Sequence, residues 1–130
     1  MKILVFAEQR DGKFKKPAFE SVRAARTIAD RLGGEVVALV LGDSVNSIAS
    51  SLGGYGTNNV LVAEHPRLAT YSTTAYAKVV AAAAVKESAS VIIVPATAMG
   101  KDLAPRVVVD RKSTRLNSSH IQKSRMPSSA

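Results

Sequence analysis

The sequence predicts an α/β fold built on a doubly wound, Rossmann-like parallel sheet. Four short apolar segments alternate with four helical segments, in the order β-α-β-α-β-α-β-α. The apolar segments are nearly continuous, as expected of strands that are covered on both faces. Short connections favour parallel strands joined by helical crossovers. The length of 130 residues fits one ordinary domain.

The first strand is predicted at Lys2–Ala7, and a polar segment with an Asp11-Gly12 turn signal follows it. The first helix is expected to begin near Pro17, because proline suits a first helical position. Apolar residues then recur at spacings of three and four, which places them on one buried helix face: Ala18, Val22, Ala25, Ala29 and Leu32. Gly33-Gly34 supplies a left-handed stop.

The second strand is predicted at Glu35–Leu41, and a short helix follows it with Ser44 as its N-cap. The apolar residues of this helix predict its buried face: Val45, Ile48, Ala49 and Leu52. Gly53-Gly54 is expected to end the helix, and the third strand is predicted at Asn59–Ala63.

A long helix is predicted from about residue 73 to residue 87, and it carries few charged residues. More than one of its faces is therefore expected to be covered, either by tight packing as a crossover helix or by a partner chain. The fourth strand is predicted at Ser90–Pro95, with a last helix beginning after Gly100. A fifth strand would normally follow, so the sheet is expected to be truncated.

Half of the net charge of +8 lies in the last sixth of the chain. Residues 110–130 hold five of the 18 lysines and arginines but one of the ten acids. We predict an α/β domain at residues 1–109 and a basic, serine-rich, disordered tail at residues 110–130. The tail has no aromatic residue for base stacking and no helical periodicity, which argues against nucleic-acid binding.

Several classes of protein are excluded by composition. The chain has no cysteine, which rules out disulfide scaffolds, thiolate metal sites and cysteine nucleophiles. Its two histidines, His65 and His120, lie in unrelated contexts, so we expect no metal site. No apolar run is long enough to span a bilayer. The first residues do not resemble a signal peptide, so a cytoplasmic protein is expected.

Glycine-rich and acidic motifs give no catalytic signature. Gly53–Gly56 follows a helix and precedes a strand, the reverse of a dinucleotide-binding loop. Glu8 is the sole acid expected near the crevice at the carboxyl ends of the strands, where a lone acid is more often a solvated loop residue. Catalytic residues are therefore predicted to be absent.

One segment is placed where a ligand would bind. Thr97, Gly100 and Lys101 lie between the fourth strand and the last helix, at the sheet edge where open parallel sheets bind ligands. They are candidates for a weak anion site, offering a hydroxyl, a close backbone approach and a charge. Helix capping with a surface salt bridge is the alternative interpretation, and it is favoured.

Five segments together resemble the N-terminal domain of the electron transfer flavoprotein alpha subunit. They span residues 1 to about 107, and the last is the most specific: Ile3–Phe14, Val36–Gly42, Ala49–Gly54, Val60–His65 and Ile92–Val107. The family continues its last helix differently from this chain. Residues 113–130 instead resemble translated adaptor or vector DNA, so the tail is not expected to be native.

The resemblance implies a subunit of an electron carrier and not an enzyme. In the family, alpha pairs with a beta subunit, and the heterodimer carries one FAD and an AMP held largely by beta. It takes electrons from dehydrogenases and passes them to a respiratory acceptor. The alpha C-terminal domain binds most of the FAD through motifs well beyond residue 110. No FAD-binding residue is therefore transferred to this sequence, and we expect the chain alone not to retain FAD.

A second function remains open. The predicted fold is also that of adenine-nucleotide alpha-hydrolase-like proteins, so the chain is alternatively a small adenine-nucleotide-binding module resembling universal stress proteins. Such a module would bind AMP or ATP at the edge formed by the first and fourth strands.

Overall fold

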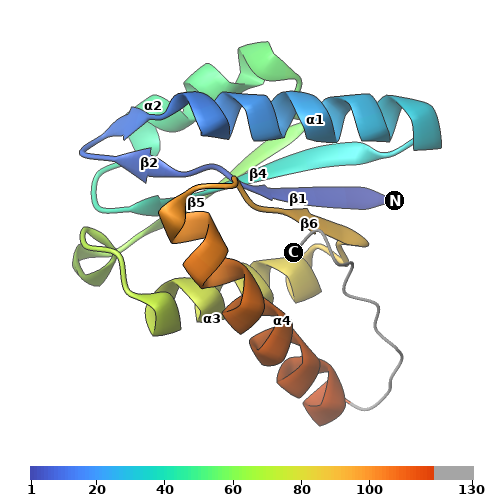
Figure 1. The fold of residues 1–130 in the computed structure, drawn as a ribbon. Helices are drawn as coiled ribbons and strands as arrows, with labels where there is room; N and C mark the ends of the chain where they lie inside the picture. The colour runs from blue at the N-terminus through green and yellow to red at the C-terminus, as the bar shows by residue number, and fades with distance from the viewer. Residues whose placement is uncertain (119–130) are drawn as a thin grey trace.

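The computed structural model describes residues 1–118, with side chains described for residues 1–110. Its main sheet has four parallel strands in the order β5-β4-β1-β6, which confirms the predicted α/β class (Figure 1). The strands are β1 (Lys2–Phe6), β4 (Glu35–Gly42), β5 (Asn59–Glu64) and β6 (Val91–Ile93). The central strand β1 pairs on both sides, with Ile3 aligned to Val36 and to Val91.

Helices cover both faces of this sheet, as Figure 1 shows. One layer contains α1 (Lys16–Leu32), α2 (Asn46–Ala49) and the 3-10 helix η1 (Ser50–Tyr55). The other contains α3 (Thr73–Lys86) and α4 (Ala98–Ser118). Alternate residues of a strand pack against the two different layers, because successive side chains of a strand point to opposite faces. Ile3 and Val5 pack with the α1 layer, whereas Leu4 and Phe6 pack with the α3 layer.

The buried face predicted for the first helix is confirmed except at its end. Ala18, Val22, Ala25 and Ala29 are buried, but the Leu32 side chain is 63% exposed. Leu32 is the last residue of α1, directly before the glycines at which the helix ends. Gly33 follows with φ 73°, the predicted left-handed stop, and donates its N–H to the Ala29 carbonyl.

Two predictions about the second helix are wrong. Ser44 is not its N-cap: this residue has φ 59°, and Val45 occupies the cap position. The Glu64 carboxyl at the end of β5 accepts the Asn46 N–H at 2.8 Å and does the capping from a distant strand. Gly53-Gly54 does not end the helical segment either, because both lie inside η1. Gly56, with φ 108°, is the residue that ends it.

The polar segment after β1 forms a hairpin that the pattern did not predict. Strand β2 (Gln9–Arg10) pairs antiparallel with β3 (Lys13–Phe14). The Asp11-Gly12 turn is confirmed, with both residues at positive φ, as a two-residue hairpin turn requires. Strands of two residues are too short to show an alternating pattern, so nothing but the turn was visible in the sequence.

Helices α3 and α4 pack against each other beneath the sheet. This packing accounts for the low charge of α3, as the crossover-helix interpretation predicts. Helix α4 begins at Ala98, two residues before Gly100, and not after this glycine as predicted. It continues to Ser118 and so crosses the predicted domain boundary at residue 110. The division into domain and tail stays a prediction, and residues 119–130 lie outside the described part.

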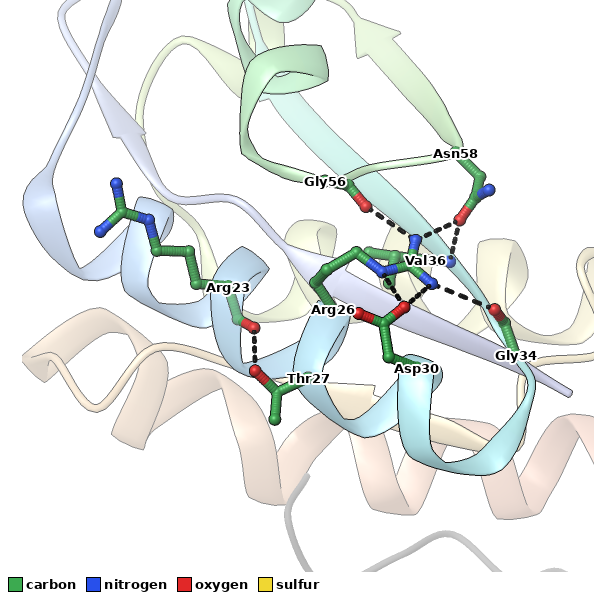
Figure 2. A network of polar contacts seen from close by, with 8 residues as sticks. All are labelled: Arg23, Arg26, Thr27, Asp30, Gly34, Val36, Gly56 and Asn58. Atoms are coloured by element: carbon green, nitrogen blue, oxygen red, sulfur yellow. Dashed lines mark hydrogen bonds and ion pairs between the residues drawn. The ribbon is translucent and has the colours of Figure 1, made fainter.

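A polar network fastens α1 to the loops at the amino ends of the strands (Figure 2). The Arg26 guanidinium donates to the Gly56 carbonyl at 3.1 Å and to Asn58 Oδ1 at 2.9 Å, and it pairs with Asp30. Asn58 Oδ1 also accepts the Val36 N–H at 2.8 Å. Arg26, together with Asn58, thus links α1 to the start of β4 and to the loop that leads into β5.

Candidate functional site

The carboxyl ends of β1 and β6 form the topological switch point of the sheet. The chain leaves β1 toward α1 on one face and leaves β6 toward α4 on the other (Figure 1). In open α/β sheets, the diverging loops at such a point leave a crevice in which ligands bind. The predicted candidates Thr97, Gly100 and Lys101 do follow β6 at this edge.

The two diverging loops are joined by a hydrogen bond. Glu8, two residues after β1, is 1% exposed, so its prediction as a solvated loop residue is wrong. Its Oε1 atom accepts a hydrogen bond from the Thr97 hydroxyl at 2.5 Å. Burial of an acid needs a hydrogen-bond partner, and the loop after β6 supplies it. The structure therefore places an acidic side chain between the two loops.

Thr97 also caps helix α4. Its Oγ1 accepts the Gly100 N–H at 3.0 Å, the contact that an N-cap residue makes with the third residue of a helix. Its carbonyl accepts the Lys101 N–H at 2.8 Å. These contacts support the capping interpretation of the segment.

The close backbone approach expected at Gly100 is made to another part of the same chain. A Cβ atom added at this position would lie 1.8 Å from the Pro95 carbonyl oxygen. The first turn of α4 thus packs directly on the end of the β6 segment. Lys101 is exposed. The anion site stays a prediction. Two of the groups expected to form it, the Thr97 hydroxyl and the Gly100 N–H, already have hydrogen-bond partners within the chain.

A second polar cluster lies beside the first turns of α3 and α4. The Tyr71 hydroxyl donates to Asp102 Oδ2 at 2.7 Å, and the Thr73 hydroxyl donates to the same oxygen. The Tyr71 ring packs edge-on against the buried Tyr76, which joins this cluster to the core. Sequence reasoning missed the cluster, because Tyr71 and Asp102 are 31 positions apart and no sequence pattern links them.

The cluster shifts the pKa values of two of its members. Hydrogen bonds from Thr73 and then Tyr71 hold the pKa of the Asp102 carboxyl below its usual range. Burial raises the pKa of the Tyr71 phenol, and the nearby Asp102 carboxylate also raises it. At neutral pH the arrangement is therefore a charged carboxylate held by two neutral hydroxyl donors.

We predict that Asp102 stabilises the fold near neutral pH and not in acid. Its pKa is lower in the folded chain than in the unfolded chain, so the stabilisation is present above pH ~4 and is lost as the pH falls through the folded pKa. Asp102→Asn should lower the free energy of urea unfolding at neutral pH. The difference from the parent chain should shrink toward zero in stronger acid. A difference that does not change with pH would contradict the prediction.

Other ligand sites are not evident in the described part of the chain. Gly53–Gly56 forms the end of η1 and is followed by strand β5, so no helix begins directly after these glycines as a phosphate loop would require. Among the described residues, no group of three or more metal-binding side chains comes together. None of the described helices combines the length and the apolar character needed to cross a membrane.

Residues 3–110 match the family model described as the electron transfer flavoprotein domain. The chain belongs to the electron transfer flavoprotein family. The match covers the strands from Ile3 onward and the helices up to residue 110 of α4, including Glu8 and Thr97. It agrees with the extent of the resemblance found in the sequence, which ends near residue 107.

Curated relatives of the family carry names of electron-transfer subunits. Acryloyl-CoA reductase electron transfer subunit beta of Anaerotignum propionicum is 45% identical over 104 residues, which is 80% of this chain and 28% of that protein. Electron transfer flavoprotein subunit alpha of Bacillus subtilis is 41% identical over 106 residues, covering 82% and 32%. Lactate dehydrogenase (NAD(+),ferredoxin) subunit LctC of Acetobacterium woodii is 34% identical, covering 81% and 25%.

These shares of length limit what the relatives imply. The chain spans between 25% and 32% of the three curated relatives named above. Two of the three names describe subunits of enzymes, a reductase and a dehydrogenase, and the third describes an electron carrier. The family assignment therefore holds for this stretch, whereas the activity of the whole proteins does not transfer with it.

Proposed function

We propose that this chain is the supporting N-terminal portion of an alpha-type electron transfer flavoprotein subunit. In this role it packs against a beta-type subunit, and the assembly carries FAD between dehydrogenases and an electron acceptor. The chain supplies no acid–base chemistry and no FAD-binding residue of its own. The FAD is held by a part of the longer subunit to which this stretch does not correspond.

The observation that carries this proposal is the Glu8–Thr97 hydrogen bond across the switch point. A phosphate or a nucleotide needs open space and hydrogen-bond donors at this edge. Here the edge holds a buried acidic side chain, and the Thr97 hydroxyl and the Gly100 N–H are already paired. A domain whose usual ligand position is occupied by its own side chains is suited to support and not to cofactor binding.

The same observation weighs against the alternative of an adenine-nucleotide-binding module. An AMP phosphate at this edge would approach the Glu8 carboxyl and would have to displace the Thr97 hydroxyl. A buried carboxyl that loses its hydrogen-bond donor to a ligand is left unpaired, which costs free energy. We therefore propose that AMP does not bind this chain with micromolar affinity, which corresponds to about −8 kcal/mol. Calorimetric titration with AMP measures this directly.

Reconstitution tests the supporting role. The purified chain is mixed with a beta-type subunit of a close relative and with FAD, and the mixture is separated by gel filtration. We expect the chain to co-elute with the beta-type subunit and no flavin absorbance to follow the chain when it is run without that subunit. Stoichiometric flavin on the chain alone would overturn the proposal, as would failure of the two proteins to co-elute. A full-length alpha subunit serves as the positive control.

A further inference from the structure

The positive charge of the domain is concentrated in one short segment. Residues 10–23 hold five of the 13 lysines and arginines of residues 1–109 but two of its nine acids. The segment therefore supplies a net charge of +3 of the +4 carried by residues 1–109. All five cations are exposed: Arg10, Lys13, Lys15, Lys16 and Arg23. These five residues lie in the β2–β3 hairpin, at the N-terminus of α1 and within the first half of α1. We call them the basic cluster.

Four of the five residues of the basic cluster oppose local stability. Arg10 and Lys13 are direct partners across the hairpin, and like charges in such a pair repel each other. Lys15 and Lys16 lie at the N-terminus of α1, whose first turn contains no acid, although cations are unfavourable at this end of a helix. In the described part of the chain, the ion pairs use Lys2, Arg26 and Arg106, and none uses a cation of the cluster. Local stability therefore does not explain the presence of these four cations.

Three aromatic rings lie beside the basic cluster and bridge three elements. Phe14 of the hairpin packs edge-on against Phe19 of α1 at 5.7 Å, and Phe19 stacks on Tyr55 of η1 at 4.3 Å. The Arg23 guanidinium lies 5.3 Å from the centre of the Tyr55 ring. Figure 2 shows the Arg23 side chain extending away from the Arg26 network. All three residues are half-buried, so part of each lies at the surface.

We propose that the basic cluster and its three aromatic rings form a docking surface for an acidic protein surface. The partner is a redox protein of the electron-transfer assembly, so the identity of the partner rests on the proposed function. Aromatic residues and arginine are the residue types that concentrate binding energy at protein interfaces. The lysines would steer an acidic partner toward the rings and speed its association. A small, charge-steered contact is typical of transient electron-transfer encounters.

Protein is favoured over nucleic acid as the occupant by the arrangement of the rings. Sequence-tolerant binding of single strands depends on bases stacking on open aromatic faces. Here the faces of Phe19 and Tyr55 are turned toward each other, with an interplanar angle of 32°, and Arg23 lies over Tyr55. These contacts within the chain already occupy aromatic faces on which bases would have to stack.

Fluorescence anisotropy with a synthetic acidic peptide tests the surface without flavin or a beta-type subunit. The probe is a labelled peptide of glutamates around one central tryptophan, and a second peptide has glycine in place of the tryptophan. We expect salt-sensitive binding of the tryptophan peptide to the full chain and several-fold weaker binding of the glycine peptide. The variant Lys13→Glu, Lys15→Glu, Lys16→Glu should weaken binding by about tenfold or more at low salt.

A charge-matched variant separates the surface from the overall positive charge. Arg111→Glu, Lys112→Glu, Arg115→Glu changes the net charge by the same amount at a distant part of the sequence, and it should bind the peptide within about twofold of the parent chain. Circular dichroism confirms that each variant is folded. Equal losses in the two variants, or no measurable binding, would overturn the docking surface. Tighter binding of a single-stranded DNA of matched charge would overturn it in favour of nucleic acid. Neither result depends on flavin retention, so the proposed function is tested separately.

Discussion

Gly100→Ala is expected to destabilise the fold by about 3 kcal/mol or more, enough to unfold a marginally stable chain. The added Cβ would lie 1.8 Å from the Pro95 carbonyl oxygen and 3.0 Å from a Val94 side-chain carbon. The main clash is with backbone, so no side-chain rotation relieves it, and the first turn of α4 must move. Urea unfolding followed by circular dichroism measures the loss.

Gly53→Ala is the matched control for this substitution. Gly53 lies in η1, and a Cβ atom added there would meet nothing within 4 Å. The same change of residue type should therefore be neutral or should stabilise the chain by up to about 1 kcal/mol. If both variants lose similar stability, the close approach of α4 to the β6 segment is not the cause.

Thr97→Val should cost about 2 to 5 kcal/mol, the second large effect that we expect. Valine matches threonine in shape but removes two hydrogen bonds at once. The Glu8 carboxyl would lose its 2.5 Å donor while it remains buried, which costs about 1.5 to 3 kcal/mol for a bond to a charged group. The Gly100 N–H would lose its cap, for about 0.5 to 2 kcal/mol more.

Two further variants separate the hydroxyl from its partner. Thr97→Ser keeps the hydroxyl and should retain most of the stability. Combining Thr97→Val with Glu8→Leu replaces both polar partners by apolar groups and should recover part of the loss, because no buried acid is left without a donor. A double variant as unstable as the sum of its parts would show that Glu8 and Thr97 do not act together. The measurement is again urea unfolding, in a double-mutant cycle.

Closure of the switch point connects these stability effects with the proposed function. If the hydrogen bond between the two loops is what excludes a ligand, the domain keeps its strand order while losing the site that this order usually provides. Under the proposed function, FAD is then bound by other parts of the longer subunit. The domain would contribute a rigid surface. The basic cluster is the part of that surface whose charge and neighbouring rings indicate the kind of partner that would bind.

The candidate site was only partly predictable. Thr97, Gly100 and Lys101 were correctly placed after the fourth strand, because a glycine and a hydroxyl before a helical pattern are local signals. The sequence indicates that Glu8 is the acid nearest to the crevice, but it does not indicate that Glu8 is buried. Its partner lies 89 positions away, and one-dimensional patterns do not report such contacts. The Asp102 cluster escaped prediction for the same reason.

Local pattern was sufficient for the strands and for most helices of this protein. The four apolar segments were predictable because strands of a parallel sheet leave runs of apolar residues, most clearly in β1 and β4, which are buried along almost their whole length. Helix ends were less predictable: Gly33 acts as expected, but the segment near Gly53 ends at Gly56. There, the Arg26 side chain fills the space that a Cβ atom at position 56 would need, and it bonds to Gly56 and Asn58. The segment therefore ends at Gly56, which has a left-handed conformation.

The sequence by itself determined the fold class, the positions of the strands and the family resemblance, since these depend on periodicity and on runs of neighbouring residues. Only the tertiary structure decided that Glu8 is buried, that Glu64 caps α2, and that the rings of Phe14, Phe19 and Tyr55 meet beside the basic cluster. The physical reason is that these contacts join elements far apart in the chain. Their geometry follows from how helices and strands cross and not from the order of residues within any one of them.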